Sequence, residues 1–220
     1  MRSVIFDLDG TLADTSRDLI AAANACFVAR GHGEMLDPGA DAATAFGGGR
    51  AMLRLGFERL GIADEALVDA DYPRLLAAYE AAIDRHTTLY PGAMAAVATL
   101  KARGFAVAIC TNKPEGLARL LLKRLGILAE FGALIGADTL ATRKPDPAPF
   151  EAAVAGAGGT PGRALLVGDT QTDRDTARAA GAPIVLVTFG PAGDAVAALA
   201  PDALLPAYAE LPGIAERLLR

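Results

Sequence analysis

The sequence holds few of the residues that mark specialised classes of small protein. Only two of its 220 residues are cysteines, and it contains no tryptophan. Neither Cys26 nor Cys110 stands in the spacing of a zinc site, and two thiols in apolar segments do not make a disulfide framework. We therefore expect two reduced, packed thiols and a protein of a reducing compartment, with the cytoplasm as the default location.

Positive charge and long apolar runs are also scarce. Lys and Arg number 21 against 26 Asp and Glu, which gives a net charge of −5, and no dense basic run occurs. Because binding to a nucleic-acid backbone needs a clustered basic face, we expect no nucleic-acid partner. Residues 19–29 are apolar apart from Asn24, but this segment is too short to cross a bilayer. The four mainly apolar residues before Asp7 predict no secretory leader, so we expect no membrane association.

Two glycine-rich signatures of nucleotide binding are absent. No Gly-x-x-x-x-Gly-Lys-Ser/Thr segment occurs, which excludes a P-loop, and no Gly-x-Gly-x-x-Gly follows the first predicted strand, which argues against a dinucleotide-binding fold. The chain does have 52% hydrophobic residues, over a length that suits one large domain or one domain with an insert. A chain of this size can therefore bury a hydrophobic core without disulfide bonds or structural metal ions.

Short apolar runs alternate along the chain with segments of helical character. The runs are continuous, which favours a parallel sheet covered on both faces, and the alternation favours right-handed crossovers. We therefore predict a doubly wound α/β sheet. The predicted strands are residues 3–6, 106–110, 133–135, 164–167 and 184–187, and the predicted helices are residues 93–103, 115–125, 147–155 and 173–180.

One stretch departs from this alternation. Between about residues 15 and 86 no convincing strand occurs, and apolar residues recur at helical spacing. The predicted helices there are residues 14–30, 51–60 and 65–84. We predict a Rossmann-like core of residues 1–14 and 88–220, with a helical cap domain of residues 15–87 inserted into it. Because the insert follows the carboxyl end of a strand, where α/β sheets bind ligands, it is a candidate lid, with a plain helical appendage as the alternative.

At four predicted strand ends the sequence has polar residues of a kind that is rare in a hydrophobic core. In Asp7-Leu8-Asp9-Gly10-Thr11, two carboxylates would repel each other unless they share a cation or a proton. The hydroxyl and backbone amides of Thr111-Asn112-Lys113 can hold an oxyanion. The rigid loop Arg143-Lys144-Pro145-Asp146-Pro147 fixes a lysine, and Asp173 follows Gly168-Asp169 by about one helical turn.

Together these places supply carboxylates, one fixed lysine, a hydroxyl and free amides. An oxygen-rich site without histidine or cysteine suits Mg²⁺ rather than zinc. A hard cation, a lysine and a hydroxyl around a carboxylate nucleophile meet the needs of phosphoryl transfer, and aspartate can serve as the covalent acceptor. The motifs therefore predict Mg²⁺-dependent phosphoryl transfer.

The ordered motifs resemble the haloacid dehalogenase-like hydrolase superfamily over nearly the whole chain. Asp7–Thr11 is similar to its first motif, Thr111 with Asn112 to its second, Lys144-Pro145 to its third, and Gly168-Asp169 with Asp173 to its fourth. Within the superfamily the chain resembles the phosphoglycolate phosphatases. The segments that carry this closer resemblance are Tyr90–Gly92, Thr111–Pro114, Arg143–Pro147 and, in the predicted cap, Phe46–Arg50.

The resemblance implies a two-step hydrolysis. Asp7 would attack phosphorus and form an aspartyl-phosphate, and Asp9 would protonate the leaving alkoxide and then activate water. Thr111 and the amide of Asn112 would hold a phosphoryl oxygen, and Lys144 would neutralise charge on the nucleophile and the phosphate.

The resemblance also implies the metal ligands and the substrate class. Mg²⁺ would be bound by Asp7, the backbone carbonyl of Asp9 and Asp169, while Asp173 would orient a metal-bound water or the lysine from behind them. The partner would be a small phosphorylated metabolite, with 2-phosphoglycolate, hydrolysed to glycolate and phosphate, as the first expectation. In the cap, Gly49 and its neighbouring glycines would bring Arg50 to a substrate carboxylate, or Arg50 is simply a residue at a helix start.

Several alternatives stay open. Asp9 favours phosphate monoesters or phosphohexose mutases over haloacids and phosphonates, so a β-phosphoglucomutase-like mutase is the nearest enzymatic rival. Phosphatases of sugar phosphates, pyrophosphate or nucleotides are further ones. A receiver-like phospho-switch and an idle binding module are the alternatives that are not enzymes. Lys113 and Arg143 are interpreted as solvated, and the protein is expected to be a monomer or a homodimer.

Overall fold

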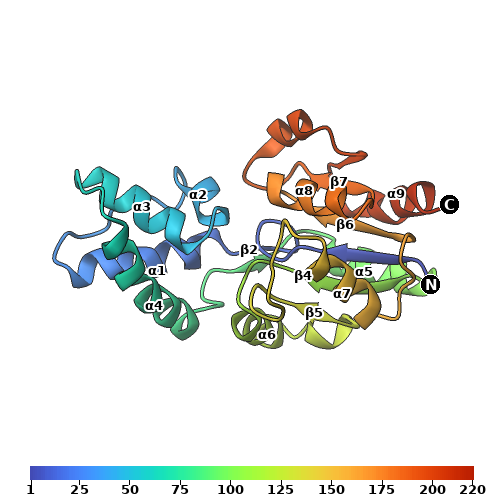
Figure 1. Ribbon diagram of the computed structural model, residues 1–220, viewed down its shortest axis with the longest axis horizontal. Helices are drawn as coiled ribbons and strands as arrows, with labels where there is room; N and C mark the ends of the chain where they lie inside the picture. The colour runs from blue at the N-terminus through green and yellow to red at the C-terminus, as the bar shows by residue number, and fades with distance from the viewer. The chain divides into compact units, whose positions relative to one another are not determined.

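The computed structural model describes residues 1–220 and divides the chain into two compact units. The core unit is Met1–Ala13 with Leu89–Arg220, and the inserted unit is Asp14–Thr88 (Figure 1). Short strands β2 (Ala13–Asp14) and β3 (Thr88–Leu89) pair where the chain leaves the core unit and where it returns. None of the helices is both long and apolar enough to cross a membrane.

A six-stranded parallel sheet forms the centre of the core unit, in the order β5-β4-β1-β6-β7-β8. The strands are β1 (Ser3–Phe6), β4 (Ala106–Cys110), β5 (Leu134–Ile135), β6 (Ala164–Gly168), β7 (Ile184–Val187) and β8 (Ala203–Leu205). Every residue of β1, β4, β6 and β7 is buried, which explains their unbroken apolar runs. The doubly wound α/β prediction is confirmed.

Helices cover the sheet on both faces (Figure 1). They are α5 (Ala93–Ala102), α6 (Glu115–Arg124), α7 (Ala148–Gly156), α8 (Gln171–Ala179) and α9 (Leu211–Leu218). On one face, Phe150 of α7 and Ala177 of α8 pack into a cluster with Ile5 and Leu166 of the sheet. On the other, α5 contacts both β4 and α9.

The predicted elements of the core unit differ from the structure mainly near the C-terminus. Strand β5 begins one residue later than predicted, and β6 extends to Gly168. Strand β8, helix α9 and the 3-10 turns η1 (Leu128–Glu130), η2 (Gly193–Leu199) and η3 (Tyr208–Glu210) were not predicted. Strand β8 at the sheet edge has only three residues, between Asp202 and Pro206, so its apolar run is too short to predict a strand.

The inserted unit contains only helices between its two ends. They are α1 (Ser16–Ala29), α2 (Ala42–Phe46), α3 (Gly49–Arg59) and α4 (Glu65–Ala81), of which the five-residue α2 was not predicted. Phe27 of α1 packs edge-on against Phe57 of α3, with ring centroids 5.2 Å apart. A Cβ at Gly56 would lie 2.1 Å from the Phe27 ring, so only glycine allows this close approach of the two helices.

Three buried carboxylates in the inserted unit are each fully matched by donors. Both oxygens of Asp71 accept hydrogen bonds from Arg30, at 2.6 and 3.0 Å. Asp41 is held in the same way by Arg59, with both distances 2.7 Å. Asp18 accepts from the backbone amides of His86 and Thr87 and from the Thr87 hydroxyl. Asp18 therefore fixes the end of this unit to its first helix.

Candidate active site

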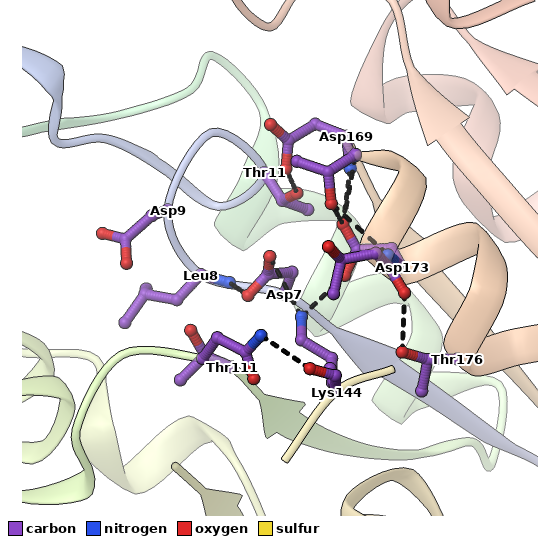
Figure 2. A network of polar contacts seen from close by, with 12 residues as sticks. Asp7, Leu8, Asp9, Thr11, Thr111, Lys144, Asp169, Asp173 and Thr176 are labelled. Atoms are coloured by element: carbon purple, nitrogen blue, oxygen red, sulfur yellow. Dashed lines mark hydrogen bonds and ion pairs between the residues drawn. The ribbon is translucent and has the colours of Figure 1, made fainter. Parts of the chain in front are cut away.

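The register of the central strands brings three loops to one edge of the sheet. Phe6, the last residue of β1, lies opposite Ile109 of β4 and Val167 of β6. The next residue, Asp7, donates its backbone amide to the carbonyl of Val167 at 2.9 Å. The polar residues after β1, β4 and β6 therefore meet at the carboxyl edge of the sheet, as Figure 2 shows.

The turn after β1 is tight because Gly10 has a positive φ of 78°. The backbone amides of Leu12 and Ala13 both donate to the carbonyl of Leu8, and Gly10 donates to the carbonyl of Ala13. A side chain with a Cβ is disfavoured at such a φ. The turn separates the side chains of Asp7 and Asp9, which point in different directions in Figure 2.

One buried lysine joins the loops. The Lys144 ammonium lies 3.1 Å from Asp7 Oδ2 and 2.6 Å from Asp173 Oδ1, and its side chain is 2% exposed. Burial acts to lower the pKa of Lys144, but the carboxylates of Asp173 and Asp7 outweigh it and raise that pKa above its usual range. The lysine is therefore a fixed positive charge. The side-chain amide of Asn112 donates to the Lys144 carbonyl at 3.0 Å, which ties the loop after β4 to this lysine.

Asp173 caps helix α8 and is fully engaged. Its Oδ2 accepts from the Thr170 amide at 3.1 Å, from the Thr170 hydroxyl at 2.6 Å and from the Asp169 amide at 3.3 Å. Its other oxygen accepts from Lys144. A Cβ at position 168 would lie 2.4 Å from the Asp173 carboxyl carbon, so Gly168 is required for this close packing. Asp173 thus orients both a lysine and the backbone before α8.

Asp7 and Asp169 are buried carboxylates in an electrostatically unfavourable place. Burial, together with the negative charge of Asp173, raises the pKa of Asp7 to about 7 against the attraction of Lys144. Burial also raises the pKa of Asp169 well above its usual range, helped by Asp173 and Asp7. The Thr11 hydroxyl donates to Asp169 at 2.8 Å and acts in the opposite direction. Two carboxylates with raised pKa values favour a proton or a cation between them.

The donor set fits a hard divalent cation. One oxygen each from Asp7, Asp169 and Asp173 lie within 4.8 Å of one another, and all three residues are buried. Lys144 pairs with Asp7 and Asp173 and leaves Asp169 without an ion pair to it, so a cation would relieve the excess negative charge. Because four donors occupy the oxygens of Asp173, Asp7 and Asp169 are the side chains best placed to bind it, while Asp173 orients them.

Asp9 is not part of this carboxylate cluster. Its carboxylate lies apart from Asp7 in Figure 2 and is bound by Lys113, whose ammonium is 2.8 and 3.0 Å from its two oxygens. The side chain of Lys113 is only 3% exposed. The interpretation of Lys113 as a solvated residue is therefore wrong, because the short turn after β4 directs it inward. Its amide donates to the hydroxyl of Thr111, which is itself buried. Arg143 is exposed, as expected.

Tyr208 is a further part of the site that sequence reasoning missed. Its hydroxyl donates to the Thr11 carbonyl at 2.7 Å, and Thr11 in turn donates to Asp169. Tyr208 also packs against Phe189, with ring centroids 5.2 Å apart. Nothing in the local sequence around η3 signals this contact, which joins residues 197 positions apart.

Gly49 and Arg50 lie in the inserted unit, at the start of α3. Arg50 donates to Asp69 at 2.9 Å and stacks 3.9 Å above the ring centre of Tyr72, and both partners belong to α4. A Cβ at Gly49 would lie 2.9 Å from the Tyr72 ring, so the glycine allows α3 and α4 to pack closely. In this structure both residues therefore have partners within their own unit.

Comparison with known proteins gives a consistent family. A family model described as haloacid dehalogenase-like hydrolase matches residues 1–181. The chain is 38% identical to a phosphoglycolate phosphatase of Rhodospirillum rubrum, covering 96% of this chain and 89% of the relative. It is 39% identical to one of Mesorhizobium japonicum, covering 99% and 96%.

Solved structures agree in fold. A predicted phosphoglycolate phosphatase from Haemophilus somnus gives a TM-score of 0.85 at 25% identity, over 97% of both chains. A putative β-phosphoglucomutase from Thermotoga maritima gives a TM-score of 0.73 at 22% identity over 100% of both chains, a likeness of fold alone. With the site geometry, the family model and the curated relatives all in agreement, the chain belongs to the haloacid dehalogenase-like hydrolases.

Proposed function

We propose that this protein is a Mg²⁺-dependent phosphatase that hydrolyses 2-phosphoglycolate to glycolate and phosphate. The observation that carries the proposal is the buried group of Asp7, Asp169 and Asp173 around a single lysine, at the carboxyl edge of the sheet. Such a group holds a hard cation and a fixed positive charge beside a carboxylate nucleophile. The choice of substrate is supported by the curated relatives, which are named phosphoglycolate phosphatases.

In this proposal Asp7 is the nucleophile. Lys144, 3.1 Å from its Oδ2, favours the carboxylate form, and the Leu8 amide donates to its Oδ1 at 2.7 Å and fixes its orientation. A bond forms between the Asp7 carboxylate and phosphorus while the bond from phosphorus to the ester oxygen breaks. The electron pair of the broken bond goes to the leaving alkoxide.

Asp9 is the proton carrier in both steps. It gives a proton to the leaving alkoxide and then, as a carboxylate, takes one from the water that attacks phosphorus. The second step breaks the bond between Asp7 and phosphorus, which releases phosphate and restores the free carboxylate. The Thr111 hydroxyl and the Asn112 amide hold a phosphoryl oxygen, and Lys144 balances the charge on the nucleophile and the phosphate.

The carboxylates of Asp7 and Asp169 and the backbone carbonyl of Asp9 would hold the Mg²⁺, with Asp173 orienting this group through Lys144 and the Asp169 amide. When bound, the cation supplies neutralisation of the charge on the phosphoryl group. The buried carboxylates with raised pKa values support such an ion, because it would offset their mutual repulsion.

The inserted unit is proposed to be a lid that excludes water during phosphoryl transfer, since it is inserted shortly after β1 and the loop that carries Asp7. Arg50 is the residue of this unit proposed to select a substrate carboxylate. The two cysteines, buried and free, support a reducing compartment such as the cytoplasm. We expect a monomer or a homodimer.

The test is release of inorganic phosphate from a panel of esters, with Mg²⁺ and with a chelator. The panel contains 2-phosphoglycolate, sugar phosphates, pyrophosphate, nucleotides and an aryl phosphate. We expect chelator-sensitive release, fastest from 2-phosphoglycolate. Faster release from a different ester would be consistent with the proposed mechanism and would overturn the proposed substrate. No release from any ester would overturn the phosphatase and favour a mutase, which isomer conversion of hexose phosphates would reveal.

A further inference from the structure

Lys113 is a buried cation that makes an ion pair with Asp9, a side chain that the proposed reaction needs elsewhere. Lysine is buried at only two positions of this chain, Lys113 and Lys144. Lys144 faces two carboxylates, those of Asp7 and Asp173. Lys113 makes an ion pair with Asp9, contacting both carboxylate oxygens. A buried ammonium is costly to the fold unless an anion of good geometry faces it.

The proposed role of Asp9 takes its carboxylate away from Lys113. To protonate the leaving oxygen, Asp9 must come within hydrogen-bond distance of an atom bonded to the phosphorus that Asp7 attacks. In this structure the Asp9 side chain lies apart from Asp7 and is bound to Lys113 instead (Figure 2). When Asp9 moves, Lys113 loses its two charge-assisted hydrogen bonds to that carboxylate.

An anionic group of the substrate can replace the lost carboxylate. The Lys113 amide donates to the Thr111 hydroxyl at 3.1 Å, so this lysine belongs to the same short turn as the hydroxyl proposed to hold the phosphoryl oxygen. A small substrate with a carboxylate next to its phosphate ester would reach both groups at once. The ammonium would then face one carboxylate before binding and another one afterwards.

We propose that Lys113 binds the carboxylate of the substrate in exchange for that of Asp9, and thereby selects phosphate esters that carry a second anionic group close to phosphorus. This inference rests on the proposed function and adds a residue that determines its specificity. An uncharged ester would bear the full cost of separating Asp9 from Lys113. Asp9 and the substrate carboxylate therefore compete for one ammonium.

The first experiment compares 2-phosphoglycolate with 2-hydroxyethyl phosphate, which has a hydroxymethyl group in place of the carboxylate. The variant is Lys113→Met, which keeps the length of the side chain and removes its charge. The matched control is Lys101→Met, because Lys101 is exposed and paired with Glu130 away from the site. In Lys113→Met, we expect kcat/KM for 2-phosphoglycolate to fall about 30-fold more than kcat/KM for the uncharged ester. The control variant should change neither.

The outcomes separate the inference from the function on which it rests. A wild type that hydrolyses both esters equally well would overturn the proposed substrate and the inference together. A wild type that prefers 2-phosphoglycolate, with a Lys113→Met variant that keeps this preference, would leave the function standing and overturn the inference alone. Equal loss on both esters in Lys113→Met belongs to this second case, because the lysine would then only position Asp9.

A binding measurement tests the competition without turnover. Asp7→Asn removes the nucleophile, and calorimetry with Mg²⁺ present then measures the affinity for each ester. Adding Asp9→Asn removes the charge that competes for Lys113. We expect the double variant to bind 2-phosphoglycolate about 10-fold more tightly than Asp7→Asn alone, and 2-hydroxyethyl phosphate no more tightly. Unchanged or weaker binding of 2-phosphoglycolate would overturn the exchange.

Discussion

The two units bury carboxylates in opposite electrostatic situations. Three lie in the inserted unit, Asp18, Asp41 and Asp71, and three lie together in the core unit, Asp7, Asp169 and Asp173. Those of the inserted unit are separate, and each has its own donors, as Asp41 has in Arg59. In the core unit the three carboxylates lie together, and the one buried lysine beside them, Lys144, pairs with only two, Asp7 and Asp173.

The pKa values show this difference directly. The hydrogen bonds from Arg59 hold the pKa of Asp41 below its usual range, whereas burial raises the pKa values of Asp7 and Asp169. A buried carboxylate with matched donors stabilises the fold. A group with more carboxylates than cations costs stability, and it is kept where it binds a ligand or reacts. The comparison therefore separates structural acids from functional ones.

The largest expected effect is on turnover, from Asp7→Asn. Loss of the proposed nucleophile should lower kcat for phosphate release by at least about 1,000-fold. At pH 8 without metal, the same change should raise the free energy of unfolding, because it removes a charge that burial disfavours. Phosphate release and chemical denaturation measure the two effects. Near-normal turnover would show that another group is the nucleophile.

The matching change in the inserted unit should change the free energy of unfolding in the opposite direction. Asp71→Asn leaves Arg30 without its carboxylate and should lower the free energy of unfolding by about 2–3 kcal/mol, less than for a fully buried pair because Arg30 is partly exposed. Denaturant titration of Asp71→Asn and Asp7→Asn under the same conditions measures the two changes in the free energy of unfolding, which should differ in sign. If Asp71→Asn stabilised the protein, the division into structural and functional acids would fail.

The pH dependence of the metal-free protein should reflect the core cluster. The pKa of Asp7 is raised from 3.8 to about 7, so the folded state binds a proton that the unfolded state has lost between these values. Its stabilising contribution is therefore present at low pH and is lost as the pH rises through about 7. Thermal unfolding with chelator should show this decline, and Asp7→Asn should flatten it. A cation binds the deprotonated carboxylates, so stabilisation by Mg²⁺ should grow as the pH rises.

The smallest expected effect on stability comes from Arg50→Ala. Its partner Asp69 is exposed, so the free energy of unfolding should fall by no more than about 1 kcal/mol. If Arg50 selects a substrate carboxylate, kcat/KM should fall more for 2-phosphoglycolate than for an aryl phosphate. Arg54→Ala is the matched control, since Arg54 is on the same helix and also pairs with a residue of α4. Equal losses on both substrates would remove Arg50 from specificity.

Much of the core unit could be predicted from the sequence because its central strands are buried on both faces. Such strands appear as continuous apolar runs, and the residues that follow them must lie at one edge of the sheet. The order of residues along the chain is therefore enough to predict that Asp7, Thr111 and Asp169 lie near one another. It is not enough to predict β8, whose apolar run is only three residues long.

Side-chain directions in the loops could not be predicted. Lys113 and Arg143 are similar basic residues beside motif residues, yet Lys113 is buried and Arg143 is exposed. The difference arises from the backbone path of each loop, which no local pattern of residue types records. The contact of Tyr208 with Thr11 has the same cause, because it depends on how the C-terminal segment returns to the first loop.

The central position of β1 has a consequence for the order in which the protein folds. Strand β1 is synthesised before the other strands of its sheet, and its neighbours pair Ser3 with Ala106 and Ala164, which are synthesised much later. The inserted unit is continuous from Asp14 to Thr88, so it can acquire structure before β4 and β6, the two neighbours of β1, are available. In pulse-labelled hydrogen exchange during refolding, we expect amides of α1 and α4 to become protected before those of β1, and the reverse order would contradict this. A late-forming centre means that Asp7, the proposed nucleophile, reaches its working geometry only after β6 has been synthesised.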